Sequence, residues 1–219
     1  MAAYKLVIGN KNYSSWSLRG WLALRAARIP FEEIRIPLRL EATPQAIRRH
    51  SPSGKVPALL DADGKVLAWE SLAIGEWAAE QAPEKELWPQ DPVARAFARG
   101  AASEMHAGFP NLRQQLPMDI RLSLPGHRYL AEAQTDIDRV IALWSECRSR
   151  FGAGGPFLFG RFGVADAMYA PVASRFRTYG VRLPPDAESY VRAIFDLPAM
   201  REWCDAAKAE TEVINYLAP

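Results

Sequence analysis

Hydrophobic residues follow two different spacings along this 219-residue chain, and the change falls near residue 82. In the first part, the β-branched apolar run at residues 4–8 predicts a buried strand. Apolar positions at Leu18, Trp21 and Leu22 predict a helix over residues 15–27. The further elements expected here are a strand over 31–36, a helix from 43 or 44 to 50, strands over 58–60 and 66–68, and a helix beginning at Glu70-Ser71.

A tight hairpin joins the last two of these strands. Asp63-Gly64 supplies the left-handed backbone that such a turn needs, and Pro57, which lacks an amide hydrogen, suits the start of the first strand. The first backbone N–H groups of the helix at Glu70-Ser71 have no partner inside that helix, so its start favours an anion. The simplest interpretation of this stretch is a hairpin followed by a capped helix.

After the hairpin and its helix, the pattern becomes purely helical. Pro83, Pro89 and Pro92 predict a linker over residues 83–92 between a first domain, 1–82, and a second, 93–219. One long helix is expected from apolar positions that recur every four residues: Val93, Phe97, Ala101, Met105 and Phe109. Further helices are expected over 130–150 and 163–179, followed by two shorter ones. We therefore predict an all-α second domain.

Composition narrows the class of protein only slightly. With 49% hydrophobic residues, 24% charged residues and a net charge of +2, the chain is typical of soluble proteins, and nothing favours a nucleic-acid partner. No segment is apolar enough for a signal peptide or a membrane span, so we expect a cytoplasmic protein without a membrane partner. Cys147 and Cys204 lie far apart, and the three histidines have no metal-ligand spacing, so no metal site is expected.

The βαβαββα order of the first domain resembles the thioredoxin fold. Val-Pro at the start of a strand, followed by Glu-Ser at the next helix start, further resembles the glutathione-binding half of the glutathione transferases. In that family the residue before a cis-proline pairs with the cysteinyl backbone of glutathione, and an acidic-Ser pair holds its γ-glutamyl end. By this resemblance, glutathione is bound by Lys55, Val56, Pro57, Glu70 and Ser71. The resemblance covers nearly the whole chain and implies a thioredoxin-like α/β domain followed by an all-α domain.

Hydroxyl residues gather where the first helix begins. By spacing alone, Ser14 and Ser15 are helix caps. The pattern Ser-Ser-x-Ser-x-Arg is similar to the zeta-class motif Ser-Ser-Cys-x-Trp-Arg, in which a serine activates the thiol of glutathione. Trp16 replaces the cysteine of that motif, and Leu18 replaces its tryptophan. By this resemblance either Ser14 or Ser15 is the catalytic residue, and the two cannot be separated by spacing.

The remaining candidates lie in the second domain. Transferases begin a buried helix there with a capping box, and Asp166 is expected to take that structural role with Gly163 at the N-cap. Family geometry places the second-substrate pocket between the domains, with the candidates Trp16, Met105, His106, Phe109 and Arg113. An acidic substrate would need a cationic partner, and Arg113, Arg175 and Arg177 are the candidates.

The resemblance implies a cytoplasmic, homodimeric glutathione transferase. Glutathione would be a co-substrate in attack on a small electrophile, or a cofactor in the cis–trans isomerisation of an unsaturated acid such as maleylacetoacetate. The alternative is a non-catalytic protein of the same fold that binds ligands or partners. A disulfide oxidoreductase is disfavoured because no cysteine lies near the first helix.

Overall fold

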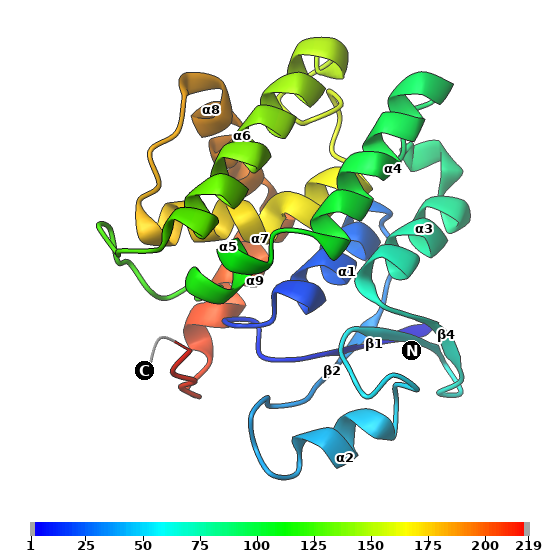
Figure 1. Cartoon of the computed structure of the whole chain (residues 1–219). Helices are drawn as coiled ribbons and strands as arrows, with labels where there is room; N and C mark the ends of the chain where they lie inside the picture. The colour runs from blue at the N-terminus through cyan, green and yellow to red at the C-terminus, as the bar shows by residue number, and fades with distance from the viewer. Residues whose placement is uncertain (1–2, 217–219) are drawn as a thin grey trace.

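The computed structural model describes residues 3–216. A four-stranded sheet with three helices occupies the first part of the chain, and helices follow (Figure 1). The elements are β1 (Tyr4–Ile8), α1 (Ser15–Ala26), β2 (Glu32–Arg35), α2 (Thr43–Arg48), β3 (Ala58–Asp61), β4 (Val66–Trp69), α3 (Ser71–Gln81), the 3-10 turn η1 (Pro83–Lys85), α4 (Pro92–Ala107), α5 (Pro110–Gln115), α6 (Ala131–Phe151), α7 (Val164–Tyr179), α8 (Pro185–Asp196) and α9 (Pro198–Ala209).

The sheet has the strand order β2-β1-β3-β4, with β2 parallel to β1 and both other pairs antiparallel. Because successive strand residues face opposite sides, the buried run of β1 serves two cores. Leu6 and Ile8 pack into the main core, whereas Val7 packs with Ile47 of α2 on the other face. Accordingly, α2 covers one side of the sheet, and α1 and α3 lie on the other, next to the helical part (Figure 1).

The helical part is built around α7, in which every residue except Arg177 is buried. This helix packs against α1, α3 and α4, so one hydrophobic core runs from the sheet into the helical part. The approach of α3 to α7 is close at Gly75, where a Cβ atom would lie 2.7 Å from Cγ1 of Val164. Glycine is therefore needed there for the two helices to meet.

The expected thioredoxin-like βαβαββα order and the helical second part are both confirmed. The long helix expected to reach Phe109 instead ends at Ala107, and a short helix, α5, begins at Pro110. Phe109 has φ of 57°, outside the right-handed helical region. The cause is local, because Pro110 disfavours helical backbone at the residue before it.

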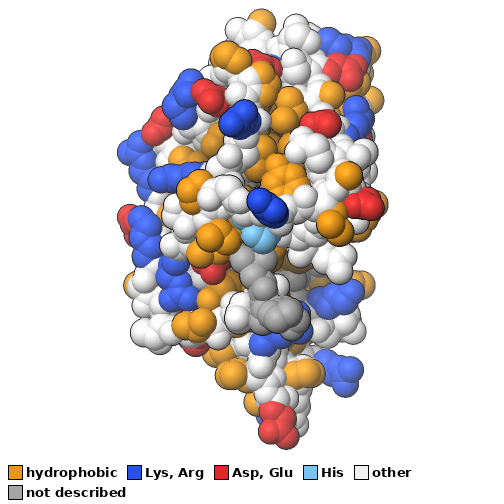
Figure 2. Space-filling view, turned by 60° about the vertical axis from the view of Figure 1, so that its left-hand side comes forward, with side chains coloured by type: hydrophobic (Ala, Val, Ile, Leu, Met, Phe, Trp, Pro, Cys, Tyr) orange, Lys and Arg blue, Asp and Glu red, His pale blue; other side chains and the backbone are white. Residues whose placement is uncertain are grey.

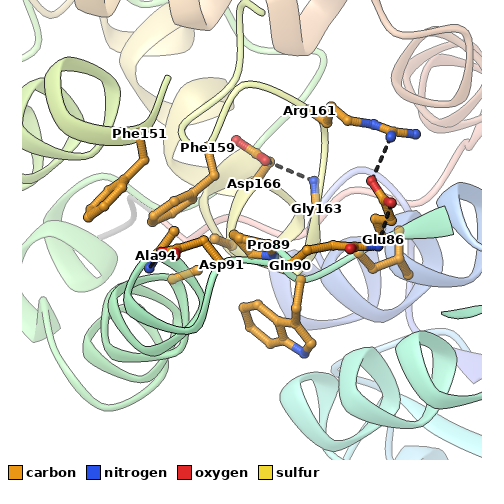
Figure 3. A pocket seen from close by; sticks show the side chains of 14 residues that line it. Glu86, Pro89, Gln90, Asp91, Ala94, Phe151, Phe159, Arg161, Gly163 and Asp166 are labelled. Carbon is orange, nitrogen blue, oxygen red and sulfur yellow. Dashed lines mark hydrogen bonds and ion pairs between the residues drawn. The ribbon is translucent and has the colours of Figure 1, made fainter. Parts of the chain in front are cut away.

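Asp166 caps α7 as expected. Its carboxylate accepts hydrogen bonds from the backbone N–H groups of Gly163 (2.9 Å) and Leu158 (3.1 Å). Figure 3 shows this carboxylate directed at Gly163, beside the stacked rings of Phe151 and Phe159. These four residues line a cavity of about 370 Å³. Burial raises the pKa of Asp166 to about 6, against the lowering effect of the two N–H donors.

Replacing Asp166 with alanine is expected to lower the free energy of unfolding by about 3 kcal/mol, because a cap is lost and two buried N–H groups lose their acceptor. Because the pKa of Asp166 is raised on folding, its contribution is greatest below about pH 4 and falls as the pH rises toward about 6. Thermal melting at pH 4 and pH 7 measures both effects. Glu188→Ala, an exposed acidic change in the first turn of α8, is the control. Unchanged melting with lost turnover would instead make Asp166 catalytic.

The surface carries mixed charge. On the face in Figure 2, Lys and Arg side chains are interspersed with Asp, Glu and hydrophobic side chains. Between residues 3 and 216, no helix combines the length and apolar character that crossing a bilayer requires.

Candidate functional site

A cavity of about 740 Å³ lies between the sheet part and the helical part of the chain. The starts of α1 and α3 and the turn before β3 contribute to one side, and α4, α5, α7 and the C-terminal segment contribute to the other. The residues that line it are Tyr13, Ser14, Ser15, Trp16, Leu38, Ile47, Ser53, Gly54, Lys55, Val56, Pro57, Trp69, Glu70, His106, Arg113, Pro117, Met118, Arg175 and Tyr216.

The two serines at the start of α1 differ in their contacts. Ser14 is the N-cap: its Oγ accepts a hydrogen bond from the backbone N–H of Ser17 and donates to Ser17 Oγ at 2.7 Å. Ser17 Oγ also accepts from the backbone N–H of Gly9 at 3.0 Å. The Ser15 hydroxyl has no hydrogen-bond partner within residues 3–216. Both hydroxyls border the cavity at the positive end of the helix dipole.

The turn before β3 offers a free length of backbone. The Val56-Pro57 peptide bond is cis, as the resemblance implied. The N–H and C=O groups of Val56 form no hydrogen bond with any part of the chain that the structure describes. Val56 is one of the residues that line the cavity. Because backbone polar groups require partners, this position suits pairing with an extended peptide.

Glu70 stands at the N-cap of α3 with φ of 86°, a backbone region costly for residues other than glycine. Its Oε2 accepts a hydrogen bond from Leu72 N–H at 3.0 Å, and Oε1 accepts from the Ser71 hydroxyl at 3.2 Å. Nδ1 of His106, on α4, lies 3.1 Å from Glu70 Oε2. The carboxylate therefore reaches the boundary between the two parts of the chain.

Two arginines pack against Trp16, and a third lines the same cavity. The guanidinium carbon atoms of Arg19 and Arg113 lie 4.3 Å and 5.4 Å from the centroid of the Trp16 ring, and Arg175 lines the cavity nearby. Arg19 is fully buried, and its Nε donates to the Met168 carbonyl at 3.1 Å. Both its terminal nitrogens lack a partner among the described residues, and so does Nη1 of Arg175.

The charges of these arginines are offset only from a distance: Glu70 acts on Arg19, and Asp136 acts on Arg113. None of the three forms a salt bridge within residues 3–216. Burial, reinforced by repulsion from Arg175 and Arg113, lowers the pKa of Arg19 to about 9. Burial and repulsion from Arg113 likewise lower the pKa of Arg175 to about 10. Because a buried unpaired charge is costly, an anion in this cavity would be stabilised.

Most of the residues singled out from the sequence meet at this cavity: Ser14, Ser15, Trp16, Lys55, Val56, Pro57, Glu70, His106, Arg113 and Arg175. Ser71 is buried behind Glu70. Met105 and Phe109 were expected to line the cavity, but they do not, because both are buried in the main core. Arg177, also a candidate partner for an acidic substrate, does not line this cavity. It lies over Phe195 at a separate cavity.

Other residues that line the cavity were not predicted from the sequence. Tyr13 directly precedes the serines, so its position in the chain could have suggested it. Trp69, Met118 and Tyr216 carry no sequence signal, because they reach the cavity only through the fold. Within residues 3–216, no three His, Cys, Asp or Glu side chains lie close enough together to hold a metal ion.

Two family models and several known proteins are similar to this chain in sequence. Residues 13–81 match the family model described as glutathione S-transferase, N-terminal domain, and residues 128–206 match the corresponding C-terminal domain. The chain is 24% identical over 200 residues to glutathione S-transferase GstB of Escherichia coli K12, covering 90% of this chain and 96% of GstB. It is 30% identical over 176 residues to a maleylacetoacetate isomerase of Pseudomonas aeruginosa, covering 74% of this chain and 76% of that protein.

A solved structure has the same fold. A glutathione transferase homologue from Burkholderia, crystallised with bound glutathione, superposes with a TM-score of 0.72 at 20% identity. The match covers 95% of this chain and all of that one. The structural similarity shows the shared fold, and the two domain matches together with the two relatives place the chain in the glutathione S-transferase family.

Proposed function

We propose that this protein binds glutathione in the cavity and activates its thiol for attack on a small electrophile. The observation that carries the proposal is the convergence on one cavity of the α1 hydroxyls, the free Val56 backbone and the Glu70 carboxylate. These groups suit a tripeptide with a thiol, a peptide backbone and an ammonium group. The fold is shared with a homologue whose structure contains glutathione.

Glutathione would be held along the start of β3. The Val56 N–H and C=O groups would pair with its cysteinyl backbone, and Glu70 would accept a hydrogen bond from its γ-glutamyl ammonium group. Lys55, which also lines the cavity, would add a positive charge for a glutathione carboxylate. Ser71 would act indirectly, because its hydroxyl donates to Glu70.

We assign thiol activation to Ser14. Its Oγ caps α1, so it lies where the helix dipole favours an anion most. The 2.7 Å contact between Ser14 and Ser17 can have either hydroxyl as donor, because hydroxyl protons rotate. When Ser17 donates to Ser14, the Ser14 proton is free to donate to a thiolate. Ser15, whose hydroxyl has no partner in the described part of the chain, is the alternative donor.

A second candidate function is glutathione-dependent isomerisation of an unsaturated acid. Two arginines without a salt bridge in the described part of the chain favour it, because Arg113 and Arg175 both line the cavity that would hold the second substrate. The 30% identity to a maleylacetoacetate isomerase of Pseudomonas aeruginosa points in the same direction, as does the resemblance of the Ser-Ser motif to the zeta class. Trp16 occupies the position of the zeta-class cysteine, so this activity would have to proceed without that thiol.

Calorimetric titration with glutathione, followed by turnover with a panel of neutral and acidic electrophiles and with maleylacetoacetate, tests the proposal. Binding with turnover supports the enzyme, and preference for the acid supports the isomerase. Glutathione binding without turnover on any member of the panel would favour the alternative of a non-catalytic binding protein. We also propose a homodimer, which analytical ultracentrifugation tests.

Glu70→Gln is expected to weaken glutathione binding about tenfold, because a charge-assisted hydrogen bond to the ammonium group becomes a neutral one. Glutamine retains a side-chain oxygen that can accept from Leu72 N–H, so the cap of α3 is preserved. Calorimetry measures the affinity. Glu80→Gln, the same change at an exposed position of α3, is the control. Equal affinities of wild type and Glu70→Gln would remove Glu70 from the binding site.

A further inference from the structure

The C-terminal segment 210–216 lies against the loop that leads into α1. The segment follows α9 without helix or strand. In Figure 1 the red end of the chain lies near the blue loop between β1 and α1. The contacts between them join residues at opposite ends of the sequence, so the fold uses one end of the chain to fix the other.

Glu210 makes the most direct of these contacts. Its Oε1 accepts a hydrogen bond from the backbone N–H of Lys11 at 2.7 Å, and its Oε2 accepts one from the backbone N–H of Asn12 at 3.0 Å. The Glu210 side chain is only 7% exposed, and Nη1 of Arg35 lies 3.6 Å from Oε1. Hydrogen bonds from N–H groups to a carboxylate are stronger than bonds between neutral groups.

Arg121 and Tyr13 extend the attachment toward the cavity. Arg121 donates to the carbonyl oxygen atoms of Glu210 and Glu212 and to the Tyr13 hydroxyl, the last at 2.9 Å. The Tyr13 hydroxyl also accepts from the backbone N–H of Ile214 at 3.0 Å. Tyr13 immediately precedes Ser14, so these bonds fix the residue before the N-cap of α1.

Glu210 does not line the cavity, so it can affect the site only through the backbone it holds. The chain from Lys11 to Ser14 is short, and Ser14 N–H donates to the Asn10 carbonyl at 2.8 Å. Any displacement of Lys11 and Asn12 is therefore passed to Ser14. A misplacement of about 1 Å in a catalytic group can reduce the rate about a hundredfold.

We propose that Glu210 is a positioning residue for the glutathione chemistry of this protein: by holding the Lys11 and Asn12 amides it sets the place of Ser14 at the cavity. The inference rests on the proposed function. It adds a requirement that the α1 sequence does not contain, because the residue that positions the serine lies 199 residues after Lys11.

The variant Glu210→Gln tests this role. The neutral amide keeps one acceptor oxygen, but its NH₂ group faces a backbone N–H instead of accepting from it. Glu212→Gln is the matched control, because it removes the same charge from the same segment and from the same partner, Arg35, while the other groups that act on its carboxylate are the backbone N–H groups of Thr211 and Glu212 itself and not the loop before α1. Glu210→Asp retains the charge and supplies a second variant that moves the carboxylate if Glu210→Gln fails to fold.

In Glu210→Gln we expect kcat to fall about tenfold, with KM for glutathione within about twofold of wild type. The pKa of the thiol of bound glutathione, followed by thiolate ultraviolet absorbance, should rise by about one unit. Hydrogen exchange at the Lys11 and Asn12 amides should accelerate. The Glu212→Gln control should match wild type in all of these quantities.

A merely structural role would lower the melting temperature and leave kcat and the thiol titration of the folded protein unchanged, and that result overturns the inference. Measurements on the wild-type protein distinguish a wrong role for Glu210 from a wrong proposed function. Wild type that binds no glutathione, or shows no turnover and an ordinary thiol pKa, refutes the proposed function and this inference with it. Wild type that is active, together with an equally active Glu210→Gln, refutes only the role of Glu210.

Discussion

Ser14→Ala is expected to raise the pKa of the thiol of bound glutathione by about two units, toward the value of about 8.5 for a free thiol. A shift of that size corresponds to about 2.7 kcal/mol of preference for the anion. One charge-assisted hydrogen bond together with the α1 dipole is of that magnitude. At pH 7, turnover should fall by about twenty-fivefold, in proportion to the thiolate fraction, while glutathione affinity changes little. Thiolate absorbance against pH and steady-state kinetics measure the two effects.

Ser15→Ala is the control, since it removes a neighbouring hydroxyl and leaves the Ser14–Ser17 contact in place. Its thiol titration should stay close to that of wild type. Ser14→Ala should also melt earlier, because removing an N-cap costs about 1 kcal/mol, and kinetics below the transition separate that loss from the chemistry. If Ser15→Ala shifts the pKa and Ser14→Ala does not, the assignment of the two serines is reversed. A single midpoint for all three proteins would mean that neither hydroxyl activates the thiol.

Arg175→Met is expected to reduce kcat/KM for an electrophile that carries a carboxylate by about thirtyfold, with less than about threefold change for a neutral electrophile. A hydrogen bond to a charged group contributes about 1.5–3 kcal/mol, or roughly a factor of ten to a hundred. Arg175 lines the cavity, and its Nη1 has no partner within residues 3–216. A readout without turnover is the melting temperature: maleate, a cis-dicarboxylate, should raise that of wild type and raise that of Arg175→Met much less.

Arg177→Met is a matched control on the same helix. Arg177 lies two residues further along α7 and faces a different cavity, beside Phe195. It should leave both the preference for acids and the maleate effect unchanged. If Arg175→Met treats acidic and neutral electrophiles as wild type does, the arginines are structural and the isomerase branch of the proposal loses its support.

Much of the fold followed from hydrophobic spacing, because strands and helices depend mainly on near neighbours. The buried run Leu6-Val7-Ile8 gave β1, and the apolar face of residues 93–105 gave α4. The break at Phe109 was missed although Pro110 marks it, because the four-residue apolar repeat extended through the proline. The spacing of apolar residues indicates which positions can share a helix face, but it does not indicate where the helix ends.

Only the part of the site that is formed by residues close in sequence could be predicted. Groups close in sequence, such as Val56-Pro57 and Glu70-Ser71, could be recognised as local motifs. Arg175 and Tyr216 reach the cavity only because α7 and the C-terminal segment fold back onto the sheet part. Met105 was misassigned because a helix that borders a cavity also has a face toward the core, and spacing alone does not say which face is which.

The continuous core described above bears on how the protein folds. Two domain models match the chain, yet buried apolar residues of α1, α3 and α7 belong to one hydrophobic core, and Gly75 lets α3 and α7 touch. Separation of the two parts would expose those faces to water, at a cost of about 25 cal/mol per Å² of apolar surface. Unfolding should therefore be a single cooperative transition in which the sheet and the helices are lost together. We therefore expect the regions matched by the two domain models to unfold together and not as separate units.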